Sequence, residues 1–182
     1  MEILVGAAAV ALVSAAAARA RRSARQRASA DPPRAAGGTG LAVGDVVLRG
    51  AAELWLTGAL ELDEDGTRIV LFRASDGAQW IVQLDERGRE LAVAAASSEL
   101  PEGSIPDRLP IQGRTLSLRR RGRARARFHG ELTGRDGPAL VTVLAESGRR
   151  VLVAVDLEGA PRLALVGERV DRAELDVLPG RR

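Results

Sequence analysis

The chain has 182 residues with a formal net charge of +3 and no cysteine, which excludes disulfide bonds, thiolate metal sites and thiol nucleophiles. Lysine is also absent, which excludes a lysine-dependent phosphate-binding loop. Apart from an N-terminal segment of about 40 residues, the length suffices for one domain or for two very small ones.

The N-terminus combines an apolar run with a cationic cluster. Residues 3–18 carry no charge, and arginines follow at once. This pattern predicts a membrane anchor helix over residues 1–20, because arginine is costly to move across a bilayer. At ~1.5 Å per residue a helix over 3–18 spans roughly 24 Å, short of the ~30 Å hydrocarbon core. The juxtamembrane arginines are Arg19, Arg21, Arg22, Arg25 and Arg27.

The anchor predicts a location. We expect a single-pass protein of a bacterial inner membrane, with the bulk of the chain in the cytoplasm and the arginines against the anionic inner leaflet. A cleaved secretory signal is an alternative, with Ala16 and Ala18 before the cleavage site, although Glu2 stands where such signals are positive. An interfacial amphipathic helix and a soluble alanine-rich helix also compete with the anchor.

A linker is expected over residues 21–40. It is basic at its start, and its later part contains Asp31-Pro32-Pro33 and three glycines in residues 37–40, which oppose both helix and strand. Such a composition is typical of a flexible tether. The folded part of the chain is therefore expected to begin near Leu41.

From Leu41 onward, short segments with period-two alternation are separated by turn residues. One example is residues 53–62, where leucines alternate with polar residues and Trp55; another is residues 79–84. This period predicts β-strands. The expected fold class is all-β.

The pattern of turns occurs twice. A shift of 71 positions aligns Asp65-Gly66 with Asp136-Gly137, and it also aligns three further turn residues in each half. This match predicts two tandem, internally repeated β-meanders, each a small barrel- or sandwich-like lobe, packed together. The first lobe is expected over 41–100, a connector over 101–112 and the second lobe over 113–180.

The two halves carry opposite charge. Residues 41–112 hold six arginines and 13 acids, whereas residues 113–182 hold 15 arginines and nine acids. Opposite fields favour packing of the lobes on each other, since each alone is small for a stable domain.

Four segments together resemble the bacterial family called domain of unknown function 4178. They are residues 41–47, the hairpin over 77–84, residues 113–130 and residues 166–170. The resemblance implies a mostly β fold, frequent membrane association, no established activity, and an association with envelope-stress and polyamine-related proteins. The chain departs from the family pattern over residues 68–72, where the family tends to carry Trp, Glu and Tyr.

The arginine-rich stretch over 119–127 is the main candidate for binding. If Gly122 turns a hairpin, Arg123, Arg125 and Arg127 lie on one face of the next strand, and Ala124, Ala126 and Phe128 lie on the other. Such a ladder could bind phosphates or acidic protein through paired hydrogen bonds. A solvated face is the alternative, and nucleic acid is less favoured because only Phe128 could stack on a base.

No constellation predicts catalysis, a metal or a cofactor. The acidic stretch Glu61–Gly66 resembles half of a calcium loop, but Phe72 stands where the bidentate carboxylate is needed, so a hairpin turn is favoured. His129, the single histidine, is expected to be structural. We therefore expect a non-enzymatic, membrane-tethered accessory or adaptor module with a protein partner, in an envelope-associated process. The alternatives are a module for anionic lipid, polyanion or acidic protein, and an enzyme with a site between the lobes.

Overall fold

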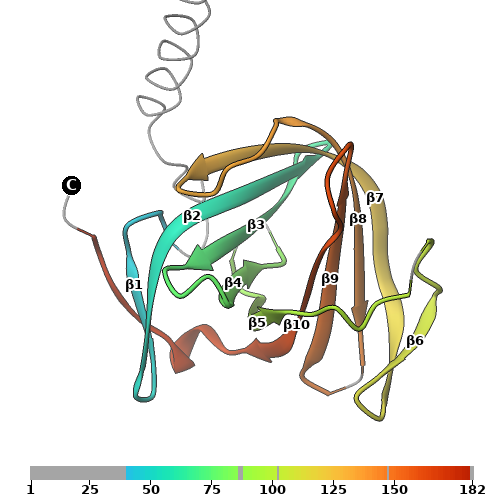
Figure 1. Ribbon diagram of the computed structural model, residues 1–182. Coiled ribbons are helices and arrows are strands. Elements are labelled where there is room, and N and C mark those ends of the chain that lie inside the picture. Colours follow the sequence, from blue (N-terminus) through green and yellow to red (C-terminus); the bar gives the residue numbers. More distant parts are fainter. Residues whose placement is uncertain (1–39, 86–87, 102, 147, 181–182) are drawn as a thin grey trace, which may run out of the picture. The chain divides into compact units, whose positions relative to one another are not determined.

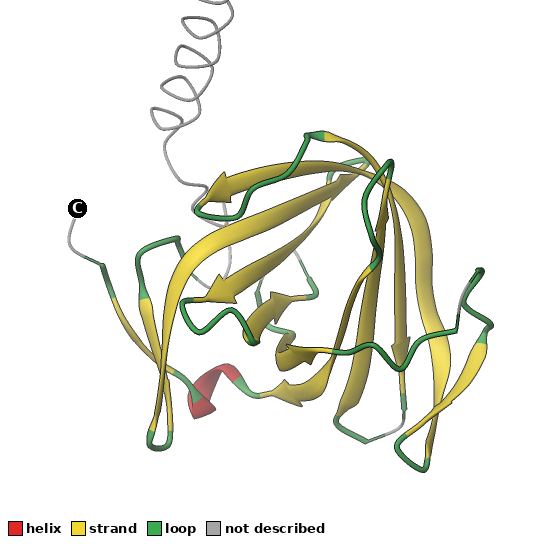
Figure 2. Ribbon diagram, in the orientation of Figure 1, coloured by secondary structure: helices red, strands yellow, loops and turns green. Residues whose placement is uncertain are grey.

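Strands dominate the computed structural model, which describes residues 40–85, 88–101, 103–146 and 148–180 (Figure 1 and Figure 2). Within these ranges the chain forms eleven strands, one 3-10 turn and no α-helix, so the predicted all-β fold is confirmed there. The elements are β1 (Val46–Arg49), β2 (Ala52–Glu64), β3 (Thr67–Ala74), β4 (Gln79–Gln83), β5 (Leu91–Ala96), β6 (Arg108–Ile111), β7 (Arg114–Gly130), β8 (Gly137–Ala145), β9 (Arg150–Leu157), β10 (Leu163–Val170), η1 (Arg172–Glu174) and β11 (Asp176–Leu178).

Eight of these strands close into an antiparallel barrel. The order is β2-β3-β4-β5-β10-β9-β8-β7, and pairing of β2 with β7 closes it, from Gly58 opposite Gly130 to Asp63 opposite Arg125. β2 has 13 residues and β7 has 17, because each pairs with two barrel neighbours and with one strand outside the barrel. The barrel therefore depends on the two longest strands.

Both halves of the chain line one interior. A single cluster of buried apolar side chains draws on all eight barrel strands, and many of its members are alanine or valine. Small side chains suit an eight-stranded barrel, whose interior is only wide enough for side chains to fill. The expected lobes over 41–100 and 113–180 thus do not form a barrel or sandwich each. They contribute four strands each to a common barrel.

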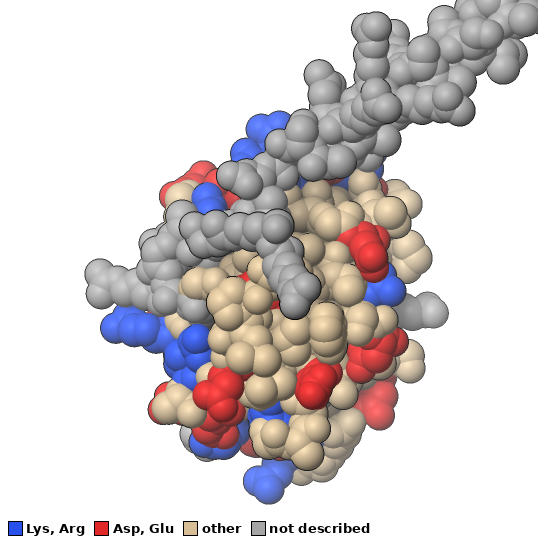
Figure 3. Space-filling view, turned by 90° about the vertical axis from the view of Figure 1, so that its left-hand side faces the viewer, with Lys and Arg blue, Asp and Glu red and all other residues tan. Residues whose placement is uncertain are grey.

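Two further apolar clusters lie outside the barrel. One joins the outer faces of β2–β5 to β1, β11 and Leu175, and the other joins the outer faces of β8–β10 to β6 and the segment before it. The buried carboxylate of Asp45 accepts hydrogen bonds from the backbone N–H of Ala42 (2.8 Å) and of Gly180 (3.0 Å). It ties both ends of the described chain to the β1–β11 extension, which faces the viewer in Figure 3.

The acidic stretch Glu61–Gly66 forms the end of β2 and the tight turn into β3. Asp65 and Gly66 both have positive φ, 48° and 91°, as a two-residue hairpin requires. This arrangement confirms the hairpin interpretation of the stretch. The preceding carboxylate, Glu64, accepts two hydrogen bonds from the Arg120 guanidinium, with Nε at 2.6 Å, across one end of the barrel.

Gly122 does not turn a hairpin, so that expectation is wrong. It lies in the middle of β7, opposite Val141 of β8. A Cβ at this position would overlap the Glu64 carboxylate. Glycine here therefore provides space for the Glu64–Arg120 ion pair and does not reverse the chain.

Within the residues that the structure describes, no helix is long and apolar enough to cross a membrane. The predicted anchor over 1–20, its arginine cluster and the linker over 21–40, apart from Gly40, lie outside the described residues.

We expect Gly122→Ala to destabilise the protein. The new methyl group must displace the Glu64 carboxylate and break its contact with Arg120, at a cost of about 1–3 kcal/mol. Urea unfolding followed by circular dichroism measures the change. Gly137→Ala, at the start of β8, is the matched control, because a Cβ there meets nothing within 4 Å. Equal stability of the two variants would contradict the assigned role of Gly122.

Candidate anion-binding site

Three arginines stand in a row on the outer face of β7. Arg123, Arg125 and Arg127 are exposed, whereas Ala124 and Ala126 between them are buried in the barrel interior. The alternation of side chains along a strand predicts this arrangement, and it holds although β7 is continuous. Successive arginines are separated by about 7 Å along the strand, at ~3.4 Å per residue.

The three guanidinium groups differ in their partners. Arg127 Nη1 lies 3.8 Å from Glu61 Oε1. Across the described ranges, Arg123 and Arg125 have neither an ion pair nor a side-chain hydrogen bond. By contrast, Arg120 and Arg121 on the same strand bind Glu64 and Asp107. Arg123 and Arg125 therefore keep their donors available to a ligand.

Glu61 lies beneath one end of this row and is almost fully buried, with 3% of its surface exposed. Its carboxylate is surrounded by cationic or ionisable groups on two neighbouring strands. Arg68 Nε is 3.2 Å from Oε1, and His129 Nε2 is 3.5 Å from Oε2, which is long for a hydrogen bond. His129 Nε2 is buried and has no closer partner in the described structure. A buried carboxylate in this setting holds the side chains of β3 and β7 in position.

The surroundings of Glu61 lower its pKa from the ordinary value of 4.5. The interaction with His129 contributes most, burial opposes it, and the charges of Arg68 and Arg127 lower the pKa further. Glu61 is therefore ionised at neutral pH and offsets part of the positive charge near Arg127. The positive charge of Arg123 and Arg125, further along β7, is not offset by an ion pair within the described ranges.

An apolar depression adjoins the row. It has a volume of about 350 Å³, and it is lined by Arg123, by apolar residues that include Pro138, Leu140 and Leu157, and by the acids Asp156 and Glu158. Asp156 is paired with Arg162. Leu140 is opposite Arg123 in the β7–β8 pairing and is 39% exposed. This side of the barrel therefore offers a ligand both guanidinium groups and apolar surface.

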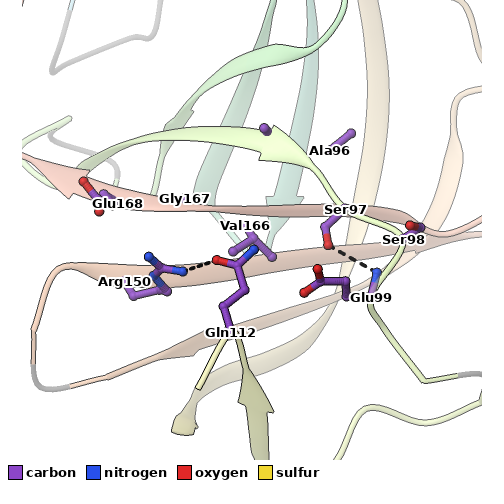
Figure 4. A pocket seen from close by; sticks show the side chains of 10 residues that line it. Ala96, Ser97, Ser98, Glu99, Gln112, Arg150, Val166, Gly167 and Glu168 are labelled. Atoms are coloured by element: carbon purple, nitrogen blue, oxygen red, sulfur yellow. Dashed lines mark hydrogen bonds between the residues drawn. The ribbon is translucent and has the colours of Figure 1, made fainter. Parts of the chain in front are cut away.

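A second cavity, of about 330 Å³, lies over the seam between β5 and β10 (Figure 4). Its floor includes Ala95, Ala96 and Gly167. Glycine is needed at position 167, since a Cβ there would overlap the backbone of β5. The polar groups at its sides are engaged with each other: Arg150 donates to the Gln112 side chain, and Ser97 Oγ accepts from the Glu99 N–H at 3.2 Å. This pairing leaves the cavity less suited to an anion than the row on β7.

Sequence reasoning identifies the three arginines but not the residues that support them. It assigns Glu61 to an acidic turn and His129 to a structural role, and it links neither to the arginines. The link arises from the β2–β7 pairing, in which Glu61 is opposite Arg127 and Ala59 is opposite His129. An isolated acid inside an apolar strand, between Leu60 and Leu62, is the signal that could have indicated a buried carboxylate.

Metal binding finds no support in the described part of the chain, where no three or more His, Asp and Glu side chains are arranged to hold an ion. The row on β7 can instead supply planar donors to phosphate or carboxylate groups.

No family model, no curated protein and no solved structure matches the chain. The resemblance to domain of unknown function 4178 therefore stays a prediction.

Glu61→Gln should destabilise the protein in a pH-dependent way. A lowered pKa means that ionised Glu61 stabilises the fold above the ordinary value of 4.5, and that this contribution is lost as the pH falls below 4.5. We expect a loss of about 1–2 kcal/mol at pH 7 and a smaller loss at pH 3.5. Urea unfolding at both pH values measures it, with exposed Glu158→Gln as the control. The same loss at both pH values would contradict the assigned role.

Proposed function

We propose that the protein is a non-enzymatic accessory module, tethered to the bacterial inner membrane, which binds anionic groups with the arginine row on β7. The observation that carries the proposal is the pair of exposed guanidinium groups, Arg123 and Arg125, without ion-pair partners on the described surface. Arg127 extends the row by one position. Arginine suits this role because its planar donors match phosphate and carboxylate oxygens.

The position of the row favours the anionic leaflet of the membrane as its target. β7 ends at Gly130, and a Cβ on Gly130 would lie 2.9 Å from Cγ1 of Val43. Val43 is only three residues from Gly40, the first described residue after the predicted linker. The arginine row thus runs toward the point where the chain leaves the barrel. An anionic leaflet attracts each nearby cation by about 1 kcal/mol.

Nucleic acid receives less support as the ligand. Single-stranded nucleic acid is bound on exposed aromatic platforms, and Phe128 is the aromatic residue next to the row. Phe128 packs against the barrel interior, where it leaves so little space beside Gly134 that a Cβ there would overlap its ring. Its ring is therefore occupied by the fold.

An enzyme with a site between two lobes also receives less support. The two halves share one barrel interior, which is lined by apolar side chains from all eight strands. The proposal accordingly places function on the outer surface of the barrel.

We also propose that the two meanders are copies of one unit. In both β1–β5 and β6–β10 each strand pairs with the next one in the chain. Asp65-Gly66 lies between β2 and β3, and the aligned Asp136-Gly137 lies at the start of β8. This order of strands supports the predicted repeat.

The arginine row is tested with the full chain reconstituted in vesicles. Because the chain has no cysteine, Leu140→Cys introduces a single labelling site beside Arg123. Energy transfer from a fluorophore at this site to labelled lipid should be stronger in vesicles with anionic lipid than in neutral vesicles, and salt should weaken it. Arg123→Gln, Arg125→Gln and Arg127→Gln together should remove the difference, with a loss of about fivefold in binding per arginine.

The matched control replaces Arg108, Arg114 and Arg135 by Gln. These are also exposed, and they give the same change in net charge from other positions on the surface. The proposal requires that this control keep the anionic-lipid signal. Equal loss in both triple variants, or equal transfer to neutral and anionic vesicles, would contradict it.

A further inference from the structure

A second exposed surface lies on the three-stranded sheet of β11, β1 and the first residues of β2. Residues paired directly across an antiparallel sheet share a face. Trp55, Val46 and Leu178 are paired in one row, and Glu53, Leu48 and Asp176 form the next row on the same face. We call these six residues the Trp55 face.

The Trp55 face is the more exposed side of this sheet, although Val46 at its centre is buried. Its opposite side carries Leu54, Val47 and Val177, which belong to the apolar cluster against the barrel. On the Trp55 face, by contrast, Trp55 is 54% exposed and Leu178 is 52% exposed. Trp55 and Leu178 lie on either side of Val46 in the same row, and two exposed large apolar side chains on one face of a sheet mark an interaction surface.

The charge of this surface is negative. Glu53 and Asp176 are exposed and have no ion pair within the described ranges, and the face carries no arginine. Two further exposed acids are near. Ser75, which precedes Asp76, donates its N–H to the Trp55 carbonyl (2.8 Å), and Glu131 donates its N–H to the Thr57 carbonyl (2.9 Å).

Figure 3 shows this side of the molecule with a broad uncharged area that is bordered both by acidic side chains, mainly at its right and below, and by basic side chains, mainly at its left and bottom. The exposed carboxylates of Glu53 and Asp176 beside apolar side chains repel an anionic membrane and attract cations. The occupant that fits is therefore basic.

We propose that the Trp55 face is the docking surface for a basic, extended segment of a partner protein, with arginine or lysine alternating with apolar residues. A cation of the segment lies on the indole of Trp55, and others pair with Glu53 and Asp176. Its apolar residues contact Leu178. This surface is separate from the arginine row on β7, so either proposal can fail without the other.

Fluorescence tests the proposal, because the chain has two tryptophans in different environments. Trp55 is exposed, whereas Trp80 is 4% exposed inside the barrel. Trp80→Phe leaves Trp55 as the single emitter. The probe is the synthetic peptide Arg-Leu-Arg-Val-Arg-Leu-Arg, blocked at both ends, and the control peptide has Glu in place of each Arg. We expect the basic peptide to shift the emission maximum of Trp55 and to protect its fluorescence from quenching by acrylamide. The acidic peptide should leave both unchanged.

If Trp80→Phe does not fold, acrylamide quenching of the unaltered chain gives the same information, since acrylamide reaches Trp55 before Trp80. Glu53→Gln with Asp176→Asn should weaken binding of the basic peptide about tenfold. The matched control, Glu99→Gln with Glu158→Gln, removes two exposed acids elsewhere and should leave the affinity unchanged.

Equal weakening by both pairs, or no response of Trp55 to the basic peptide, would overturn the proposal. A second copy of this chain is the rival occupant, because its β7 arginines could meet the carboxylates of Glu53 and Asp176. Sedimentation velocity distinguishes the two occupants. The proposal requires that the sedimentation coefficient of the protein stay constant as its concentration rises. Self-association that is lost on Trp55→Ala would instead identify a second copy of the chain as the occupant and overturn the proposal.

Discussion

Pairing of β2 with β7 holds the two halves of this protein in one barrel. It joins segments that are about 65 residues apart in the sequence, from Gly58–Gly130 to Asp63–Arg125. Without it, the two meanders would be joined along the β5–β10 seam alone, and the interior cluster would be open on one side. The same pairing places buried Glu61 beside Arg127 and His129. The same strand pairing therefore both closes the barrel and sets the charges around Arg127 on the β7 surface.

Side chains along β7 alternate between the two sides of the strand, so that one side fills the barrel interior and the other forms the cationic surface. Its small residues, such as Ala124 and Ala126, face inward, where an eight-stranded barrel has little space. Arg123, Arg125 and Arg127 face outward, and Arg127 is neutralised in part by Glu61. Arg120, opposite interior Val143, pairs with Glu64, and Arg121 pairs with Asp107. Arg123 and Arg125 have no ion pair among the described residues, although Asp63 is opposite Arg125 in the β2–β7 pairing. The opposite charges of the two halves thus cancel only locally, and both a cationic and an acidic surface are left.

Local patterns in the sequence predict the local structure well. Period-two alternation indicates strands, Asp65-Gly66 indicates a tight turn, and the spacing of Arg123, Arg125 and Arg127 indicates a common face. Gly122 misleads because a glycine between charged residues is typical of a turn, whereas here it accommodates the carboxylate of a residue 58 positions earlier. That reason is non-local.

Pairing between strands that are distant in the sequence also explains why the closed barrel and the surroundings of Glu61 could not be predicted. Nothing in the spacing of either half indicates that β2 meets β7, so one closed barrel is not distinguishable from two lobes. For the same reason the contact of Glu61 with His129 is not expected. Trp55 can be assigned to the polar side of a strand from its leucine neighbours. Its exposure follows from the extension of β2 beyond the barrel, where β2 forms a sheet with β1 and β11 and the apolar cluster covers only the opposite side of that sheet.

Closure of the barrel can be measured by solution NMR of the full chain, with nuclear Overhauser effects across the β2–β7 pair. We predict contacts between the backbone protons of Leu60 and Phe128 and of Leu62 and Ala126, together with slow amide exchange on both strands. Contacts confined to each half, with no contact between β2 and β7, would show two separate lobes and contradict the closed barrel.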